Sequence, residues 1–111
     1  MGRSAFLVTS SLALVSLFLA QTGAQAAQDE RLVQQGRLLA QSMCADCHTF
    51  GGQTRSDGLP PDFAQVGAMP STTPLSLRVF LKSPHRNMPD LILEEGQIDA
   101  LAAFILDLGG K

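Results

Sequence analysis

Residues Thr49–Ser71 form a long central stretch without an apparent helical pattern. Its turn-forming residues are Gly51, Gly52, Gly58, Pro60, Pro61, Gly67 and Pro70. A structureless loop beyond about 12–15 residues is uncommon in a compact domain unless it has a function. We therefore expect this loop to wrap around a large apolar group that the chain's own residues do not supply.

The first residues have the pattern of a secretory signal peptide. Arg3 precedes an uncharged, largely apolar stretch, Ala5–Ala20, and a more polar stretch ends in Ala24-Gln25-Ala26. Small residues at these positions are typical of signal-peptide cleavage. We expect residues 1–26 to be removed after Ala26 and the protein to be exported to the periplasm. An uncleaved anchor is the alternative, but the apolar stretch is short for a bilayer span of about 20 residues.

The remaining residues, 27–111, are expected to form a single small domain. Without the leader, which holds Arg3 and no acidic residue, the chain has seven basic and ten acidic side chains. This balance disfavours nucleic-acid binding, and no long like-charge run suggests a polybasic membrane patch. A domain of this size usually needs a staple such as disulfides, a metal or another group. Two cysteines cannot form a framework of disulfides.

Apolar spacing predicts three helices and no strand, which is an all-α fold. The expected ranges are about 29–43, Thr72 or Thr73 to Ser83, and about 94–108. Asp29 is expected to cap the first, Thr followed by Pro74 begins the second, and Gly109-Gly110 ends the third. Gly36 lies on the apolar face of the first helix, where a glycine costs about 1 kcal/mol relative to alanine. We expect the close approach of another helix there.

The sequence Cys44-Ala45-Asp46-Cys47-His48 is a C-x-x-C-H motif, the pattern of c-type haem attachment. Two thiols at this spacing can form thioethers with one porphyrin, and a histidine directly after the second cysteine can ligate its iron. The motif therefore predicts one haem c bound covalently through Cys44 and Cys47, with His48 as an iron ligand.

The two cysteines allow three other interpretations. A thioredoxin-like redox pair needs a βαβ context, for which no strands are apparent. A disulfide across two residues closes a small loop and constrains the unfolded chain little. A zinc site made of Cys44, Cys47, His48 and His85 lacks the second spaced ligand pair that structural zinc sites normally have.

The chain resembles the class I cytochromes c, in particular small bacterial mono-haem ones. The resemblance covers residues 29–108, and it rests on the C-x-x-C-H motif and on the positions Gly36, Pro61-Asp62-Phe63, Met88-Pro89 and Phe104. It implies a cytochrome c fold in which the terminal helices cross at Gly36 with Phe104 against the crossing. It also implies that the Pro61 carbonyl accepts a hydrogen bond from His48 Nδ1, which would orient the ligand.

The sixth iron ligand has to be chosen among few side chains. Met88 and Met69 are both followed by proline, and the flanks of Met88 resemble the sixth-ligand loop of the family. Met88 is therefore the expected ligand, with Met69 and His85 as alternatives. His/Met ligation raises the reduction potential, and it leaves no open position at the iron.

The expected function is therefore the transfer of single electrons between periplasmic redox proteins, without enzyme activity. The expected partners are a dehydrogenase as donor and an oxidase or respiratory complex as acceptor. They would meet a mainly apolar surface on a monomeric protein without a stable membrane anchor. A haem subunit permanently bound to a dehydrogenase is the main alternative, and a haem enzyme or sensor with an open iron site is a further one.

Overall fold

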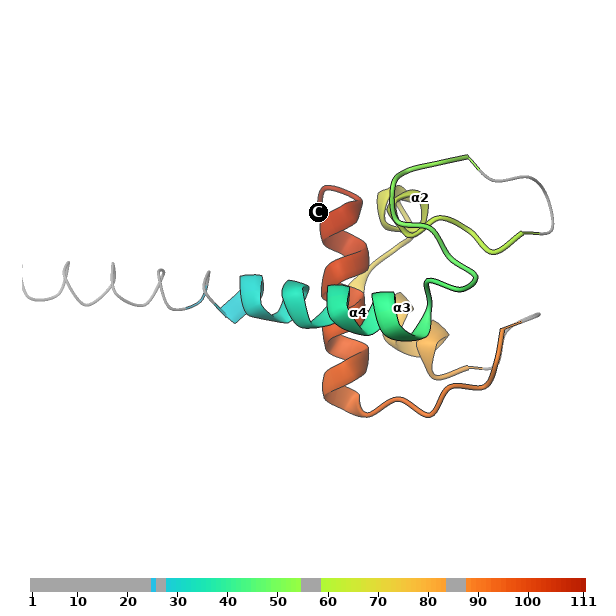
Figure 1. Cartoon of the computed structure of the whole chain (residues 1–111). Coiled ribbons are helices and arrows are strands. Elements are labelled where there is room, and N and C mark those ends of the chain that lie inside the picture. The colour runs from blue at the N-terminus through green and yellow to red at the C-terminus, as the bar shows by residue number, and fades with distance from the viewer. Residues whose placement is uncertain (1–24, 26–27, 55–58, 84–87) are drawn as a thin grey trace, which may run out of the picture. The chain divides into compact units, whose positions relative to one another are not determined.

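The computed structural model describes residues 25, 28–54, 59–83 and 88–111 (Figure 1). The chain divides into two compact units, Met1–Glu30 and Arg31–Lys111. The first helix begins in the first unit, and the cofactor site and the core lie in the second. The expected signal peptide, residues 1–26, lies outside the described residues apart from Gln25.

The described part of the chain is helical and contains no strand, as the sequence predicts. A first helix covers residues 28–43 and is followed by α2 (Phe63–Ala68), α3 (Pro74–Leu81) and α4 (Glu95–Leu108). None of the helices in the described ranges is long and apolar enough to cross a membrane.

The prediction that Asp29 caps the first helix was wrong. Gln28 before it is already helical, and the Asp29 side chain accepts a hydrogen bond from Gln25 instead, at 3.3 Å. The sequence around this point is rich in alanine and glutamine, which favour helix. A potential cap inside such a stretch therefore does not start the helix.

The predicted starts of the two later helices and the end of α4 are confirmed, while α3 ends at Leu81, two residues before the expected Ser83. Thr73 and Ser76 form a reciprocal capping box at the start of α3, with Pro74 in the first helical position. At the start of α4, the Glu94 N–H donates to the Gln97 side chain at 2.9 Å. The glycine pair that follows Leu108 ends α4.

The expectation of a helix-free loop over Thr49–Ser71 was wrong for Phe63–Ala68, which forms α2. The Asp62 carboxylate caps this short helix by accepting a hydrogen bond from the Ala64 N–H at 2.9 Å. A helix of six residues has little stability of its own, so packing against α4 must stabilise α2. Glycine and proline in the surrounding sequence conceal the helix from local pattern analysis.

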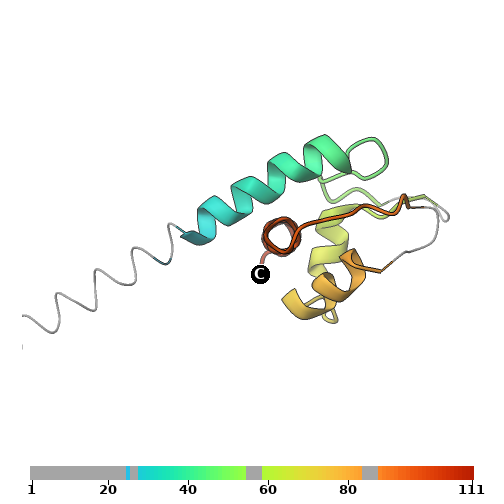
Figure 2. The ribbon, with the colours of Figure 1, turned by 90° about the horizontal axis from the view of Figure 1, so that it is seen from below.

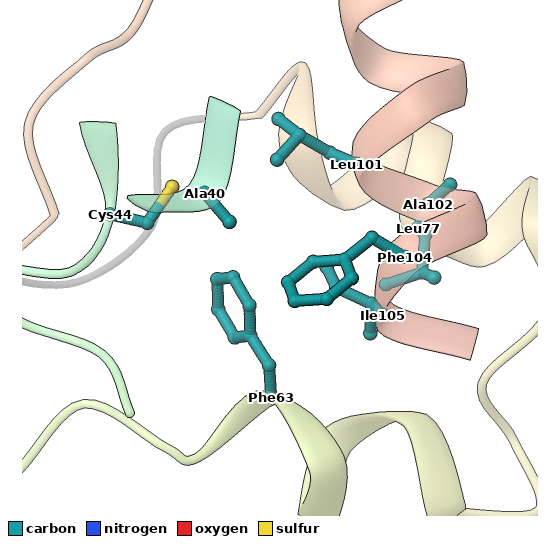
Figure 3. Close-up of a cluster of buried hydrophobic side chains, with 8 residues drawn as sticks. All are labelled: Ala40, Cys44, Phe63, Leu77, Leu101, Ala102, Phe104 and Ile105. Atoms are coloured by element: carbon teal, nitrogen blue, oxygen red, sulfur yellow. The ribbon is translucent and has the colours of Figure 1, made fainter. Parts of the chain in front are cut away.

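The core is built on α4, on which both α2 and α3 pack. Phe63 and Phe104 point into the same cluster as Ala40 and Cys44 (Figure 3). The buried apolar residues of this cluster are Ala40, Cys44, Phe63, Leu77, Leu101, Ala102, Phe104 and Ile105. The first cysteine of the motif thus lies against the main core, which fixes its position.

Gly36 allows the first helix to cross α4 at close range (Figures 1 and 2). A Cβ atom at this position would lie 2.6 Å from the carbonyl carbon of Ala100 and 2.7 Å from Cβ of Phe104. The predicted helix crossing and the place of Phe104 at it are confirmed. A second close approach, between Gly67 of α2 and Gly109 at the end of α4, was not predicted.

Candidate cofactor site

The two cysteines lie where the first helix ends. The Cys44 N–H still donates to the Ala40 carbonyl at 2.9 Å, and the Cys44 carbonyl then accepts from the N–H groups of Cys47 (3.1 Å) and His48 (2.8 Å). The motif therefore folds into a tight turn that directs the chain away from the helix. Cys44 is buried and Cys47 is exposed, and they are not joined in a disulfide. Burial raises the pKa of the Cys44 thiol.

The expected hydrogen bond between His48 and Pro61 is present. Nδ1 of His48 lies 2.7 Å from the Pro61 carbonyl oxygen, an acceptor to which only a protonated ring nitrogen can donate. Nε2 then carries the lone pair that can bind a metal. This bond fixes both the tautomer and the direction of the ring.

Three phenylalanine rings connect His48 to the helix crossing. The His48 and Phe63 rings have centroids 4.6 Å apart, Phe50 follows at 5.3 Å from Phe63, and Phe104 lies 5.8 Å from Phe50. The Arg37 guanidinium lies over the Phe104 ring, 5.1 Å from its centroid. The first two ring pairs are tilted and the third is edge-to-face. Aromatic pairs have preferred geometries, so this series helps to hold the imidazole against the core. Phe50 was not predicted to take part.

Asp62 is a component of the site that the sequence analysis did not assign. Its carboxylate is fully buried and accepts hydrogen bonds from the Thr49 hydroxyl at 2.6 Å and from the Gly52 N–H at 2.9 Å. Burial acts to raise the pKa of Asp62, but hydrogen bonds from Thr49, Gly52, Ala64 and Gln53 outweigh it and lower the pKa. An acidic residue just before an apolar run is a helix-cap signal and could have revealed part of this role.

Met88 and Met69 have different surroundings. Met88 is half-buried and begins the described segment that leads into α4. Figures 1 and 2 show this segment on the same side of α4 as residues 48–54. Met69 is 46% exposed, and its carbonyl accepts a hydrogen bond from Lys111 Nζ at 2.6 Å, which ties it to the C-terminus. The third candidate, His85, lies outside the described residues.

The alternative uses of the cysteines find no support in the described part of the chain. In these residues no group of three or more His, Cys, Asp or Glu side chains is placed to hold a metal ion. The thioredoxin-like alternative needs strands, and residues 28–54, 59–83 and 88–111 contain none.

The family comparison agrees with this geometry. The family model described as cytochrome C oxidase, cbb3-type, subunit III, matches residues 31–105. The chain belongs to this family. Comparisons with curated proteins and with solved structures gave no significant match.

The chain is thus a c-type cytochrome domain that binds haem c covalently through cysteine. The donor set fits this cofactor, because two thiols at the C-x-x-C spacing precede a histidine whose Nε2 is left available by the bond to Pro61. Such domains serve in electron transfer, as carriers or as oxidase subunits. Sequence reasoning found the attachment motif but missed Asp62 and Phe50, whose roles depend on contacts between distant segments.

Proposed function

We propose that this protein is a mono-haem cytochrome that carries single electrons between periplasmic redox proteins, with His48 and Met88 as the axial iron ligands. The observation that carries the proposal is the 2.7 Å contact between His48 Nδ1 and the Pro61 carbonyl oxygen. A histidine next to the attachment cysteines and oriented in this way has a single nitrogen available for iron. Haem c supplies a one-electron ferric/ferrous couple when it is bound.

The residues of the chain limit the chemistry to electron transfer. Cys44 and Cys47 hold the cofactor by covalent bonds. His48 donates through Nε2, while the soft thioether of Met88 favours ferrous iron and so raises the reduction potential. If His48 and Met88 both bind the iron, they would leave no position at which a substrate could bind it. No bond-making step is therefore proposed.

The proposed location is the periplasm, with the leader cleaved after Ala26. This location is supported by the signal-peptide pattern: a basic start at Arg3, the apolar stretch Ala5–Ala20 and small residues before the cut. N-terminal sequencing of the mature protein from its source tests the cleavage point. A mature chain that still begins at Met1 would contradict it.

An optical spectrum of the matured protein tests the ligands. We expect a weak near-infrared band from thioether–ferric iron, together with slow or absent CO binding to the reduced form. Met88→Ala should abolish the band, allow rapid CO binding and lower the midpoint potential on the order of 0.1 V, within the range of about 0.8 V that axial ligands span.

Met69→Ala is the matched control, because it removes a methionine that also precedes proline. This variant should keep both the band and the potential. If the band instead survives in Met88→Ala and disappears in Met69→Ala, then Met69 is the ligand. If wild type lacks the band and neither variant changes the spectrum, His85 becomes the candidate.

The alternative is a subunit that stays bound to a larger redox complex, and the description of the matching family as an oxidase subunit favours it. Gel filtration of the native protein from its source separates the two roles. A free carrier elutes near the 11.8 kDa of the chain or below it. Elution with other redox subunits at a much larger size would instead identify a permanent subunit of an oxidase or a dehydrogenase.

The proposed partner surface is mainly apolar. Large apolar side chains are exposed on α3, where Leu75 is 70% and Val79 is 60% exposed. Without its leader the chain has seven basic and ten acidic side chains, so its net charge is small. Encounters between redox proteins are typically small, below about 1,200 Å², so a modest patch suffices. A steep fall of the electron-transfer rate with ionic strength would contradict this surface.

A further inference from the structure

Asp62 has more hydrogen-bond partners than a helix cap requires. Capping α2 needs an acceptor for an N–H of the first turn, and the bond from Ala64 provides this. The same carboxylate also binds the Thr49 hydroxyl at 2.6 Å and the Gly52 N–H at 2.9 Å. These additional donors belong to the segment that follows His48, so the carboxylate joins that segment to the start of α2.

The contacts of Asp62 form a closed circuit that includes His48. His48 is followed by Thr49, whose side chain is hydrogen-bonded to Asp62. Asp62 follows Pro61, whose carbonyl oxygen lies 2.7 Å from His48 Nδ1. The chain of contacts therefore begins and ends at His48. The Phe63 N–H also donates to the Thr49 carbonyl at 2.9 Å. A displacement of the Asp62 carboxylate would therefore move the acceptor that orients the His48 ring.

Burial makes this arrangement specific to an ionised carboxylate. Asp62 is 0% exposed, and an unpaired charge in such a place would be expensive. N–H and O–H donors surround it, and donors of this kind stabilise the charged form. The protein thus holds a fixed negative charge one residue away from the carbonyl oxygen that accepts the hydrogen bond from His48 Nδ1.

We propose that Asp62 is a positioning residue for His48: its carboxylate fixes the Pro61 carbonyl against Nδ1 and thereby lowers the reduction potential of the cytochrome. This rests on the proposed ligation by His48. A firm hydrogen bond from Nδ1 makes the imidazole a more basic ligand, which favours ferric iron. A fixed negative charge nearby also favours ferric iron, because ferric iron carries more positive charge than ferrous iron. Since both effects have the same sign, loss of Asp62 raises the potential.

Asp62→Asn in the mature, haem-loaded protein is the direct test. The asparagine keeps the size of the side chain and an oxygen that can cap α2, but it removes the charge. We expect an unchanged low-spin spectrum and a higher midpoint potential, with the ferric-to-ferrous ratio at a fixed potential lowered several-fold. Asp107→Asn, which removes an exposed charge from α4, is the matched control and should shift the potential much less. Equal shifts in the two variants would overturn the proposal.

Thr49→Val tests the positioning effect without a change of charge. It removes one hydrogen bond to Asp62 and leaves the carboxylate and its role as a cap. We expect a smaller rise in potential and a faster exchange of the His48 Nδ1 proton with solvent, followed by NMR. Should Asp62→Asn fail to mature, this variant decides: an unchanged potential with unchanged exchange refutes the proposal. A wild-type spectrum without histidine ligation refutes the proposed function itself, so the two failures are distinguishable.

Discussion

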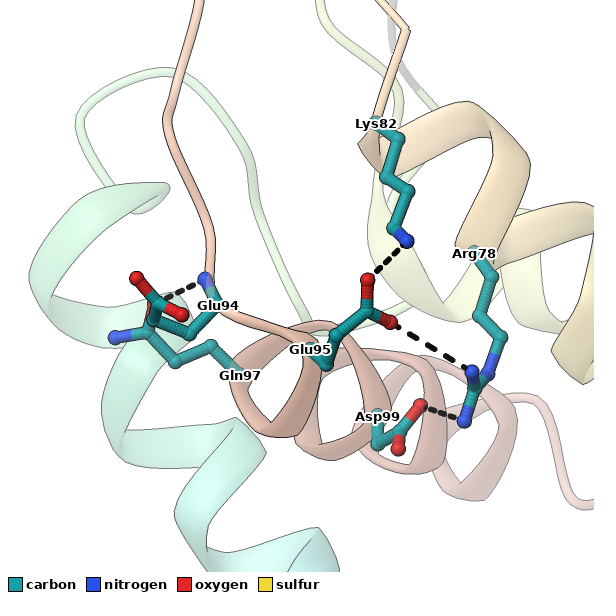
Figure 4. A network of polar contacts seen from close by, with 6 residues as sticks. All are labelled: Arg78, Lys82, Glu94, Glu95, Gln97 and Asp99. Atoms are coloured by element: carbon teal, nitrogen blue, oxygen red, sulfur yellow. Dashed lines mark hydrogen bonds and ion pairs between the residues drawn. The ribbon is translucent and has the colours of Figure 1, made fainter.

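The segments that carry His48 and Met88 are held in place by different kinds of interaction. On the His48 side, the buried Asp62 carboxylate and the bond from His48 to Pro61 connect residues 48–53 to residues 61–64. On the Met88 side, exposed ion pairs join the two ends of the segment between α3 and α4. Glu95 of α4 pairs there with Lys82 and with Arg78 (Figure 4).

This difference indicates which of the two ligands, His48 or Met88, should leave the iron first when salt is added. The hydrogen bonds to the buried Asp62 carboxylate are little affected by salt, whereas exposed ion pairs are screened and contribute little. Arg78 is 44% and Glu95 is 65% exposed, so their attraction acts largely through solvent. We therefore expect Met88 to leave the iron under conditions in which His48 stays bound.

The largest expected effect disturbs α4, on which both sides depend. Gly36→Ala would place a Cβ atom against the backbone carbonyl of Ala100. A backbone atom cannot move aside as a flexible side chain can, so the helices must separate. We expect a loss of about 3 kcal/mol in the free energy of unfolding, measured by denaturant titration of the haem-loaded protein.

Gly96→Ala is the control for this prediction. Gly96 lies in the first turn of α4, and nothing lies within 4 Å of a Cβ atom placed there. The substitution should therefore stabilise the protein, by up to about 1 kcal/mol, because alanine favours helix. Equal losses in the two variants would mean that the crossing at Gly36 is not the cause. Equal losses would also contradict the claim that the His48 side and the Met88 side both depend on α4.

Features encoded by neighbouring residues could be predicted from the sequence. The attachment motif at Cys44–His48, the start of α3 at Thr73 and Pro74, and the end of α4 at Gly109 each depend on residues close together in the chain. Gly36 was also found, because a glycine on an apolar helical face has few explanations other than close packing.

Features that depend on distant contacts were missed. The helix α2 exists because it packs on α4, and the fit of Gly67 against Gly109 follows from that packing. Asp62 could be recognised as a possible cap, but nothing in the sequence indicates that Thr49 and Gly52 donate to it. The site was therefore predictable in its chemistry and not in the interactions that position it.

A pH titration of stability sharpens the comparison on the His48 side. Hydrogen bonds lower the pKa of Asp62 below its ordinary value of 3.8 despite its burial. A carboxylate with a depressed pKa in the folded state stabilises the protein above its unfolded pKa, and this contribution is lost as the pH falls through the folded value. At pH 7 we expect Asp62→Asn to be less stable than wild type by about 2 kcal/mol.

Thermal unfolding of the two proteins between pH 7 and pH 2 measures this effect. Their difference in Tm should stay constant down to about pH 5, where Asp62 is ionised in both the folded and the unfolded chain. It should then narrow below pH 3.8, the ordinary value for the group. A difference that persists unchanged to pH 2 would mean that the charge of Asp62 does not contribute.

The smallest expected effect concerns the Met88 side. Glu95→Gln removes the acid that pairs with both Lys82 and Arg78, so the ends of the Met88 segment are held together less firmly. We expect CO to bind reduced iron a few-fold faster in this variant, with the His48 ligation unchanged. High salt should also speed CO binding to wild type, since it screens the same ion pairs. The ion pair between Arg78 and Asp99 joins α3 to α4 in both proteins, so salt should still have a smaller effect on Glu95→Gln. Asp107→Asn, at the other end of α4, should behave like wild type. If CO binds all three proteins equally fast at low and at high salt, these ion pairs do not hold Met88 in place. The contrast between the two sides must then arise within the segment between α3 and α4 itself.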